Sequence, residues 1–141
     1  MALQFGPRLQ TFLGERHPIV LGTTRKDGSV QLVPIWFEYR DGAIWLNGGP
    51  SRDWVRHMRR DPRVTLLVVD GNNMFRWAQI QGRVVDFVEQ GAGEHIEHLS
   101  QRYFGGPYPG PKNDRLIVRV TPERVTGAES REAWDVTTAA D

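Results

Sequence analysis

The sequence contains no cysteine and no long apolar run, and each of these absences excludes a class of protein; it also contains little lysine. Without cysteine there is no disulfide scaffold, thiolate nucleophile or cysteine-ligated metal, and this fits a cytoplasmic location. The longest apolar runs, such as residues 64–69, have the length of a strand, whereas a membrane helix needs about 18 such residues. The N-terminus lacks the basic and apolar regions of a secretory signal. We therefore expect a cytoplasmic protein with no membrane partner.

Charge and composition indicate one folded domain. The chain has 141 residues, of which 39% are hydrophobic and 25% are charged, as in ordinary globular proteins. The net charge of +1 argues against a wholly basic surface, so we expect no nucleic-acid partner. Among the 18 cations only Lys26 and Lys112 are lysines. The many arginines reflect either a GC-rich genome or a need to grip phosphate or carboxylate groups in two places at once.

The spacing of turns predicts a mainly β fold in which short helices separate mostly antiparallel strands. Asp-Gly pairs at 27–28 and 41–42 mark tight hairpin turns. Pro34 cannot donate to a strand ladder, so its strand lies at a sheet edge or carries a bulge. Gly82 marks a bend in a long strand. We predict strands at 19–24, 30–39, 43–47, 64–69 (buried on both faces), 75–88 and 115–120, and helices at 9–13, 51–60 and 91–104.

Two interpretations are open for the helix predicted at residues 51–60. Ser51 is a plausible N-cap, and the free N–H groups of a helix start can hold a phosphate, with Arg52 and Arg56 adding charge. Alternatively, Ser51 only caps the helix and the arginines face solvent. The residues alone favour the second interpretation, because Asp53 in the first turn would repel an anion.

Aromatic and amide side chains could form the wall of a site for a flat ring. Trp36, Trp45, Trp54 and Trp77 either border such a site or pack in the core, where tryptophan is usually found. The alternation at residues 76–82 places Trp77 and Gln79 on one strand face. Such a face could hydrogen-bond a heteroaromatic ring or be simply solvated.

The histidines do not form a recognisable metal site. His95 and His98 are three residues apart beside Glu94, but a metal needs another ligand, so we predict a surface helix and no metal. Without cysteine, a Gly-x-Ser-x-Gly turn or a paired acid and base, covalent catalysis has no support and no catalytic residue is predicted.

The order of these segments resembles the pyridoxamine 5'-phosphate oxidase-like superfamily. The resemblance covers about residues 9 to 127 and is carried by an ordered series of segments rather than by one motif. The segment from Tyr103 to Pro109 is most similar to an actinobacterial branch that uses the deazaflavin coenzyme F-420. The segments are 22–24, 27–37, 41–46, 51–64, 76–82 and 115–127.

The resemblance implies a split β-barrel, similar to FMN-binding proteins, that forms a homodimer with cofactor sites at the subunit interface. It also implies one domain at residues 1–127, followed by a polar tail at 128–141. Position by position, it implies that residues at the barrel seam border the cofactor ring, that the turn and helix from Asn47 to Arg56 face its phosphate, and that the partner subunit contributes the strand near Gln79. The implied cofactor-binding residues are Val33, Pro34, Ile35, Trp36, Asn47, Ser51, Arg52, Trp54, Arg56, Trp77 and Gln79.

One position departs from the family pattern. Most members have a phosphate-binding lysine where this chain has Trp54, and an indole supplies no charge, so Arg52 or Arg56 would have to replace it. The expected function is an F-420-dependent oxidoreductase that transfers a hydride to or from a small conjugated substrate. The alternatives are an FMN-binding oxidase or reductase of the same fold, and a non-catalytic ligand-binding or degenerate member.

Overall fold

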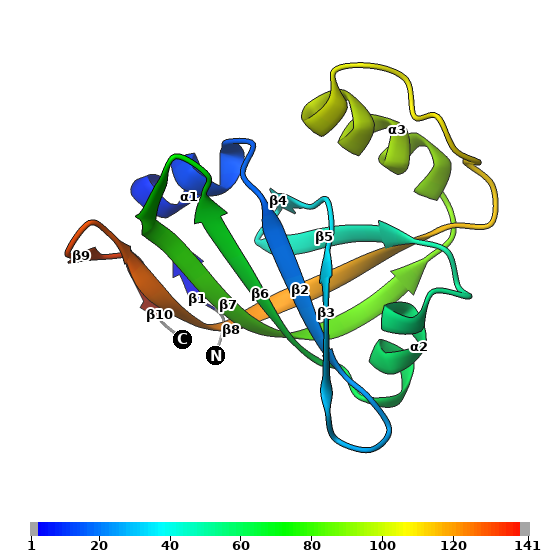
Figure 1. The fold of residues 1–141 in the computed structure, drawn as a ribbon, viewed down its shortest axis with the longest axis horizontal. Helices are drawn as coiled ribbons and strands as arrows, with labels where there is room; N and C mark the ends of the chain where they lie inside the picture. Colours follow the sequence, from blue (N-terminus) through cyan, green and yellow to red (C-terminus); the bar gives the residue numbers. More distant parts are fainter. Residues whose placement is uncertain (1–2, 139–141) are drawn as a thin grey trace.

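A long antiparallel sheet forms the body of the protein, which is described by a computed structural model over residues 3–138 (Figure 1). Its strands follow the order β3-β2-β6-β7-β8-β5-β4, with β9 added to β8, and β1 pairs with β10 in a small second sheet. The elements are β1 Leu3–Phe5, α1 Pro7–Gly14, β2 Ile19–Thr24, β3 Val30–Pro34, β4 Glu38–Arg40, β5 Ala43–Gly48, α2 Asp53–Arg60, β6 Arg63–Asp70, β7 Asn73–Val88, α3 Ala92–Phe104, β8 Leu116–Glu129, β9 Glu132–Ala133 and β10 Val136–Thr138.

The sheet curls into a barrel that stays split between its two edge strands. These edges are β3 and β4, which follow each other along the chain and are not paired with each other in the described structure. Pro34 ends β3, and the chain leaves the ladder until Glu38 begins β4. The predicted continuous strand at 30–39 is therefore wrong, but its expected edge position at Pro34 is confirmed, because proline cannot donate to a neighbouring strand.

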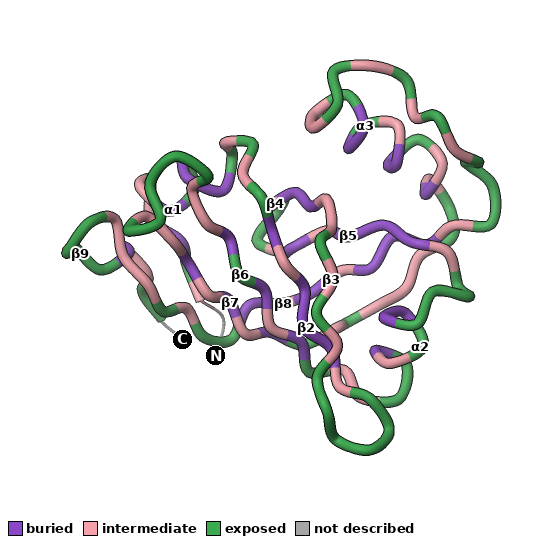
Figure 2. Tube along the Cα trace, viewed as in Figure 1, coloured by how far each residue is buried: buried purple, intermediate pink, exposed green. Residues whose placement is uncertain are grey.

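The core lies inside the curled sheet and is closed by α1 and α2. Figure 2 shows buried residues running along the central strands and on the inner sides of these helices. Strand β6 alternates between buried and more exposed positions, and Leu67 is 38% exposed, so within one chain this strand is buried on one face and not on both faces as predicted. The bend predicted at Gly82 is confirmed by a shift of register between Gln81 and Gly82.

The segment predicted as a polar tail packs against the domain over its described part. Strand β8 continues to Glu129, and β10 pairs with β1. Trp134 is only 8% exposed, stacks on Phe12 at 4.9 Å and donates its indole N–H to the Trp77 carbonyl at 2.7 Å. The packing therefore continues past the expected boundary at residue 127. Residues 139–141 of the predicted tail lie outside the described part.

Helix α2 is attached to the core through Trp54, which is 7% exposed. A Cβ atom built on Gly48 would lie 2.3 Å from the Trp54 ring, so the indole occupies space that only a glycine leaves free. The N-cap is Arg52, without a side-chain cap bond, so the prediction of Ser51 as N-cap is wrong. Asp53 forms an ion pair with Arg56 on the exposed side of the helix.

A cluster of charges around Arg76 joins several segments at one end of the barrel. The guanidinium donates hydrogen bonds to carboxylate oxygens of Glu129 at 2.7 Å, Asp70 at 3.3 Å and Glu15 at 3.1 Å. It also lies over the Phe12 ring, 4.8 Å from the ring centroid. Its hydrogen bonds hold the pKa of Glu15 and of Glu129 below the usual value. The cluster links β7 and β8 to the segment after α1.

Within residues 3–138, no helix has the length and apolar character needed to cross a membrane.

Replacement of Gly48 tests the packing of Trp54. We expect Gly48→Ala to lower the free energy of unfolding by about 1–3 kcal/mol, because the added methyl group collides with the indole. Urea unfolding followed by circular dichroism measures the change. Gly14→Ala is the matched control, since a Cβ atom added there would meet no other atom within 4 Å. Equal stability of the two variants would contradict the assigned contact.

The Arg76 cluster predicts an acid-sensitive contribution to stability. A carboxylate whose pKa is lowered in the folded protein contributes stability above its unfolded pKa, near 4.5, and loses it as the pH falls toward the folded pKa. Arg76→Met should therefore be less stable than wild type at pH 7, with the difference shrinking at pH 3. Urea unfolding at both pH values tests this. Arg83→Met, at an exposed ion pair with 3.7 Å between partners, is the control. A difference that is constant with pH would refute the prediction.

Candidate functional site

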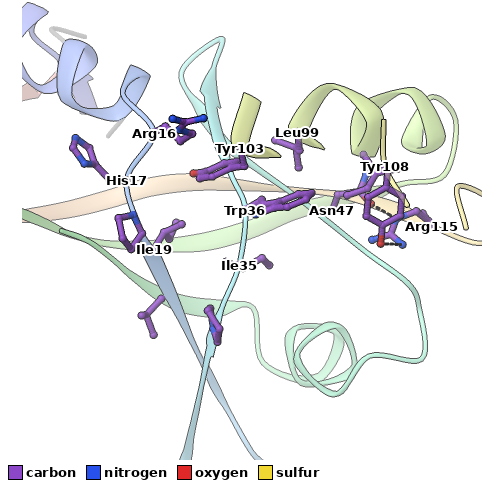
Figure 3. A pocket seen from close by; sticks show the side chains of 14 residues that line it. Arg16, His17, Ile19, Ile35, Trp36, Asn47, Leu99, Tyr103, Tyr108 and Arg115 are labelled. Carbon is purple, nitrogen blue, oxygen red and sulfur yellow. Dashed lines mark hydrogen bonds between the residues drawn. The ribbon is translucent and has the colours of Figure 1, made fainter. Parts of the chain in front are cut away.

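A cleft of about 680 Å³ opens where the barrel is split, between the segment after β3, the start of β2 and the overlying helix α3 (Figure 3). Its position follows from the break at Pro34, which frees Ile35 and Trp36 from the sheet. The backbone N–H of Ile35 donates to the Ile19 carbonyl at 3.2 Å, which fixes the freed segment against β2. The volume is in the range of cofactor and substrate pockets.

Helix α3 forms the roof of the cleft and stands apart from the barrel in Figure 1. Ile96 and Leu99 are buried, and both line the cleft instead of joining the main core cluster. Arg102 fastens the helix by donating to four backbone carbonyls at 2.9–3.1 Å: those of Leu13, Gly14, Glu15 and Phe37. The first three belong to the end of α1 or follow it, so Arg102 also satisfies carbonyls that a helix end leaves free.

Three aromatic side chains form a flat wall in the cleft. Trp36 and Tyr103 stack with ring centroids 5.7 Å apart and planes within 3°, and Tyr108 meets Trp36 edge-on at 6.3 Å. Burial raises the pKa of Tyr103, so its hydroxyl is neutral. That hydroxyl is buried and has no hydrogen-bond partner among the described residues. A planar aromatic ligand would gain stacking energy against such a wall.

Cationic side chains lie at both ends of the cleft. Arg115 donates from Nε to the side-chain amide oxygen of Asn47, Oδ1, at 2.6 Å and from Nη1 to the Tyr108 hydroxyl at 3.3 Å. Arg16 and His17 line the opposite end. Among the described residues that line the cleft there is no aspartate or glutamate. The site therefore suits a ligand that is flat in one part and anionic in another.

The loop after α3 is fixed against the helix and brings Tyr108 to the cleft. Glu97 accepts the Tyr108 backbone N–H at 3.1 Å and pairs with Lys112 at 2.7 Å. The hydrogen bond with Lys112, supported by Gln101 and the Tyr108 N–H, lowers the pKa of Glu97 to about 2. The Ser100 hydroxyl donates to the Gly106 carbonyl at 2.7 Å.

Four of the sequence-predicted residues are brought together in the cleft: Pro34, Ile35, Trp36 and Asn47. The others lie elsewhere. Val33 packs against the core cluster, and Gln79 lines a hollow on the outer face of the sheet. Trp77 lies on β7, where its carbonyl accepts the Trp134 N–H.

The residues predicted on α2 do not reach the cleft. Trp54 is in the core, so its ring does not border the cleft. Ser51 and Arg52 are exposed, and Arg56, paired with Asp53, lines a separate shallow hollow. Their predicted role in holding a phosphate remains a prediction.

His95 and His98 contact a carboxylate that was not considered from the sequence. Both histidines bond Glu38, at 3.1 and 2.8 Å, instead of Glu94. His95 is buried, so the prediction of a surface helix holds only for one side of α3.

Sequence reasoning missed the residues that α3 and its following loop contribute. Ile96, Leu99 and Tyr103 follow the spacing of one helix face, which would have marked them as a buried stripe. Arg115 precedes the last long strand, and nothing local distinguishes it from the other arginines. Its role is visible only from its contact with Asn47 in the folded structure.

Comparisons with known proteins agree with this architecture. The chain is 28% identical over 121 residues to a biliverdin reductase from Mycobacterium tuberculosis (strain CDC 1551 / Oshkosh) that depends on reduced coenzyme F-420, with 83% of each chain covered. It superposes on a solved F-420 reductase with a TM-score of 0.77 at 28% identity, covering 83% of this chain and 94% of that one. A conserved hypothetical protein from Mycobacterium tuberculosis gives a TM-score of 0.71 at 26% identity, covering 94% and 85%.

The family assignment rests on a match along nearly the whole chain. The sequence pattern of the pyridoxamine 5'-phosphate oxidase family matches residues 5–128, which include the split sheet, α3 and every segment that lines the cleft. The fold expected from the resemblance, a mainly β split barrel, is confirmed. The chain therefore belongs to the pyridoxamine 5'-phosphate oxidase family, and its similarity extends to F-420-dependent reductases.

Proposed function

We propose that the protein is an oxidoreductase that binds coenzyme F-420 in the cleft and transfers a hydride to or from a small conjugated substrate. The observation that carries this proposal is the composition of the cleft wall: a stacked aromatic pair, arginines at both ends and no carboxylate among its described residues. These groups fit the planar ring and the phosphate-bearing tail of the cofactor. Two similar proteins, a biliverdin reductase and an F-420 reductase, are named for the same coenzyme.

The residues of this chain bind and orient, while the bound cofactor supplies the hydride chemistry. Trp36 and Tyr103 offer a flat surface on which a ring system stacks. Arg115 offers a guanidinium that is already held in place by Asn47. Ile96 and Leu99 cover the cleft with apolar side chains and reduce the access of water.

We also propose that the protein forms a homodimer through the outer face of β3, β2 and β6. Val30, Leu32 and Leu67 are 58%, 69% and 38% exposed there, and they line one broad hollow. Val20 lines both this hollow and the cleft, so a second copy seated on this face would lie beside the cleft. A partner on this face would extend the cleft wall, and Gln79 would lie in the interface.

Cofactor titration tests the proposed activity. We expect saturable quenching of tryptophan fluorescence by F-420, because Trp36 lies in the cleft wall, and weaker binding of FMN. Arg115→Ala should raise the dissociation constant for F-420 by about 5- to 100-fold through loss of a charge-assisted contact. Arg131→Ala, on an exposed turn, is the matched control. Arg52→Ala reports whether the cofactor tail reaches α2. Saturable quenching by FMN without any by F-420 would overturn the cofactor assignment.

Light scattering tests the proposed dimer. The wild-type protein should have the mass of a dimer at micromolar concentration, and Leu32→Asp should be monomeric, because a carboxylate would be buried in the interface. Met74→Asp is the control, since Met74 is 75% exposed on the β6–β7 hairpin, away from this face. A monomeric wild-type protein, or a dimeric Leu32→Asp, would rule out this interface.

A further inference from the structure

A continuous series of hydrogen bonds joins Arg115, at the cleft, to the far side of α3. Arg115 Nε donates to Oδ1 of Asn47 at 2.6 Å. The amide nitrogen of Asn47 contacts the Ala92 carbonyl at 2.9 Å and Nδ1 of His95 at 3.1 Å. Nε2 of His95 contacts one oxygen of Glu38 at 3.1 Å, and His98 contacts the other at 2.8 Å.

The central members of this series are removed from water. Asn47 is 6% exposed, and the side chains of His95 and Glu38 are 3% and 10% exposed. A buried polar atom that loses its partner has no water to replace it, so each bond constrains the next. The contacts of Arg115 with the Tyr108 hydroxyl and the Pro111 carbonyl are longer, at 3.3 and 3.4 Å. Asn47 is therefore the main fixed point for the guanidinium.

The positions of the protons follow from the partners. The Asn47 amide nitrogen is a donor only, so Nδ1 of His95 must be the acceptor and its proton must be on Nε2. That proton is donated to the Glu38 carboxylate. Burial acts to raise the pKa of Glu38, but the contacts with His95 and His98 outweigh it and hold the pKa below its usual value.

We propose that Glu38 and His95 are positioning residues for the cleft: they fix the tautomer of His95 and thereby the amide of Asn47, which orients Arg115. If Glu38 could not accept the hydrogen bond from Nε2–H, the proton of His95 could move to Nδ1, which would then face the Asn47 amide nitrogen donor to donor. Rotation of the amide removes that contact, but it turns Oδ1 toward the Ala92 carbonyl, which now accepts from the amide at 2.9 Å, and it presents a nitrogen to Arg115. Neither orientation of the amide then satisfies all of its neighbours, and the 2.6 Å bond to Arg115 is weakened or lost. The ligand readout below rests on the proposed binding of F-420, whereas the orientation of Arg115 does not.

Two replacements of Glu38 separate hydrogen bonding from packing. Glu38→Gln keeps an oxygen that accepts from His95, and we expect its dissociation constant for F-420 to stay within about twofold of wild type. Glu38→Leu keeps the approximate volume but removes the acceptor, and we expect binding about tenfold weaker. His98→Ala removes the exposed partner of the other carboxylate oxygen but keeps the bond between Glu38 and His95, so we expect a smaller loss of binding than in Glu38→Leu.

A double-mutant cycle shows whether the effect passes through Arg115. Glu38→Leu should cause no further loss of F-420 binding in the Arg115→Ala background, because the residue it positions is already absent. Additive losses, or equal losses in Glu38→Gln and Glu38→Leu, would overturn the proposal.

Nitrogen NMR gives a readout that needs no cofactor. The imidazole shifts of His95 should report the Nε2–H tautomer in wild type and Glu38→Gln but not in Glu38→Leu, where the Arg115 Nε–H signal should also change. If Glu38→Leu does not fold, His95→Phe is used in its place. Phenylalanine fills the space of the imidazole but gives the Asn47 amide no acceptor, and the Arg115 Nε–H signal is then the readout. An unchanged Arg115 signal refutes the proposal. If wild type binds no F-420, the proposed function fails, and the NMR result still decides whether Arg115 is positioned.

Discussion

Helix α3 is fastened to the barrel by polar contacts near both of its ends, and the cleft depends on where these contacts place the helix. Arg102 reaches four backbone carbonyls, and Asn47 donates to the Ala92 carbonyl near the start of the same helix. Hydrogen bonds have a defined length and direction, whereas apolar contacts favour any arrangement that removes more surface from water. A helix held only by Ile96 and Leu99 would gain by closing onto the barrel. Polar fastening near both ends of α3 instead sets the position at which these buried side chains line the cleft.

The second condition for the cleft is the opening in the barrel. Pro34 ends β3 because it has no N–H to donate, and the chain crosses to β4 without pairing. That crossing brings Trp36 beneath Tyr103, which is 67 positions away in the sequence. At α2 the family resemblance implies a charged residue, but Trp54 is buried against Gly48 and serves the core. The fixed positive charge of the described cleft comes from arginines outside α2.

Local chemistry predicted most of the fold but less of the site. Asp-Gly turns and Gly82 act within a few residues, so the turns and the bend at these positions were predicted, whereas Pro34 marked an edge but not the break in the strand that follows it. Strand β8 was predicted too short: it continues through Pro122, which lies opposite Gly82 beside the shift of register, a place where a strand tolerates proline. Trp134 reads as part of a polar segment, and only the folded chain shows that it stacks on Phe12.

The site was predicted in part for a similar reason. Pro34, Ile35 and Trp36 are consecutive in the sequence, so finding one of these wall residues located the others. Arg115 and Asn47 are 68 positions apart, and their contact depends on the path of β5 and β8. Burial of Glu38, His95 and Asn47 also costs desolvation, and well-packed apolar residues often stabilise such a position as much or more. Apolar residues could not transmit an orientation, however. The retention of three buried polar groups behind a single arginine therefore fits a demand for direction at the cleft better than a demand for stability.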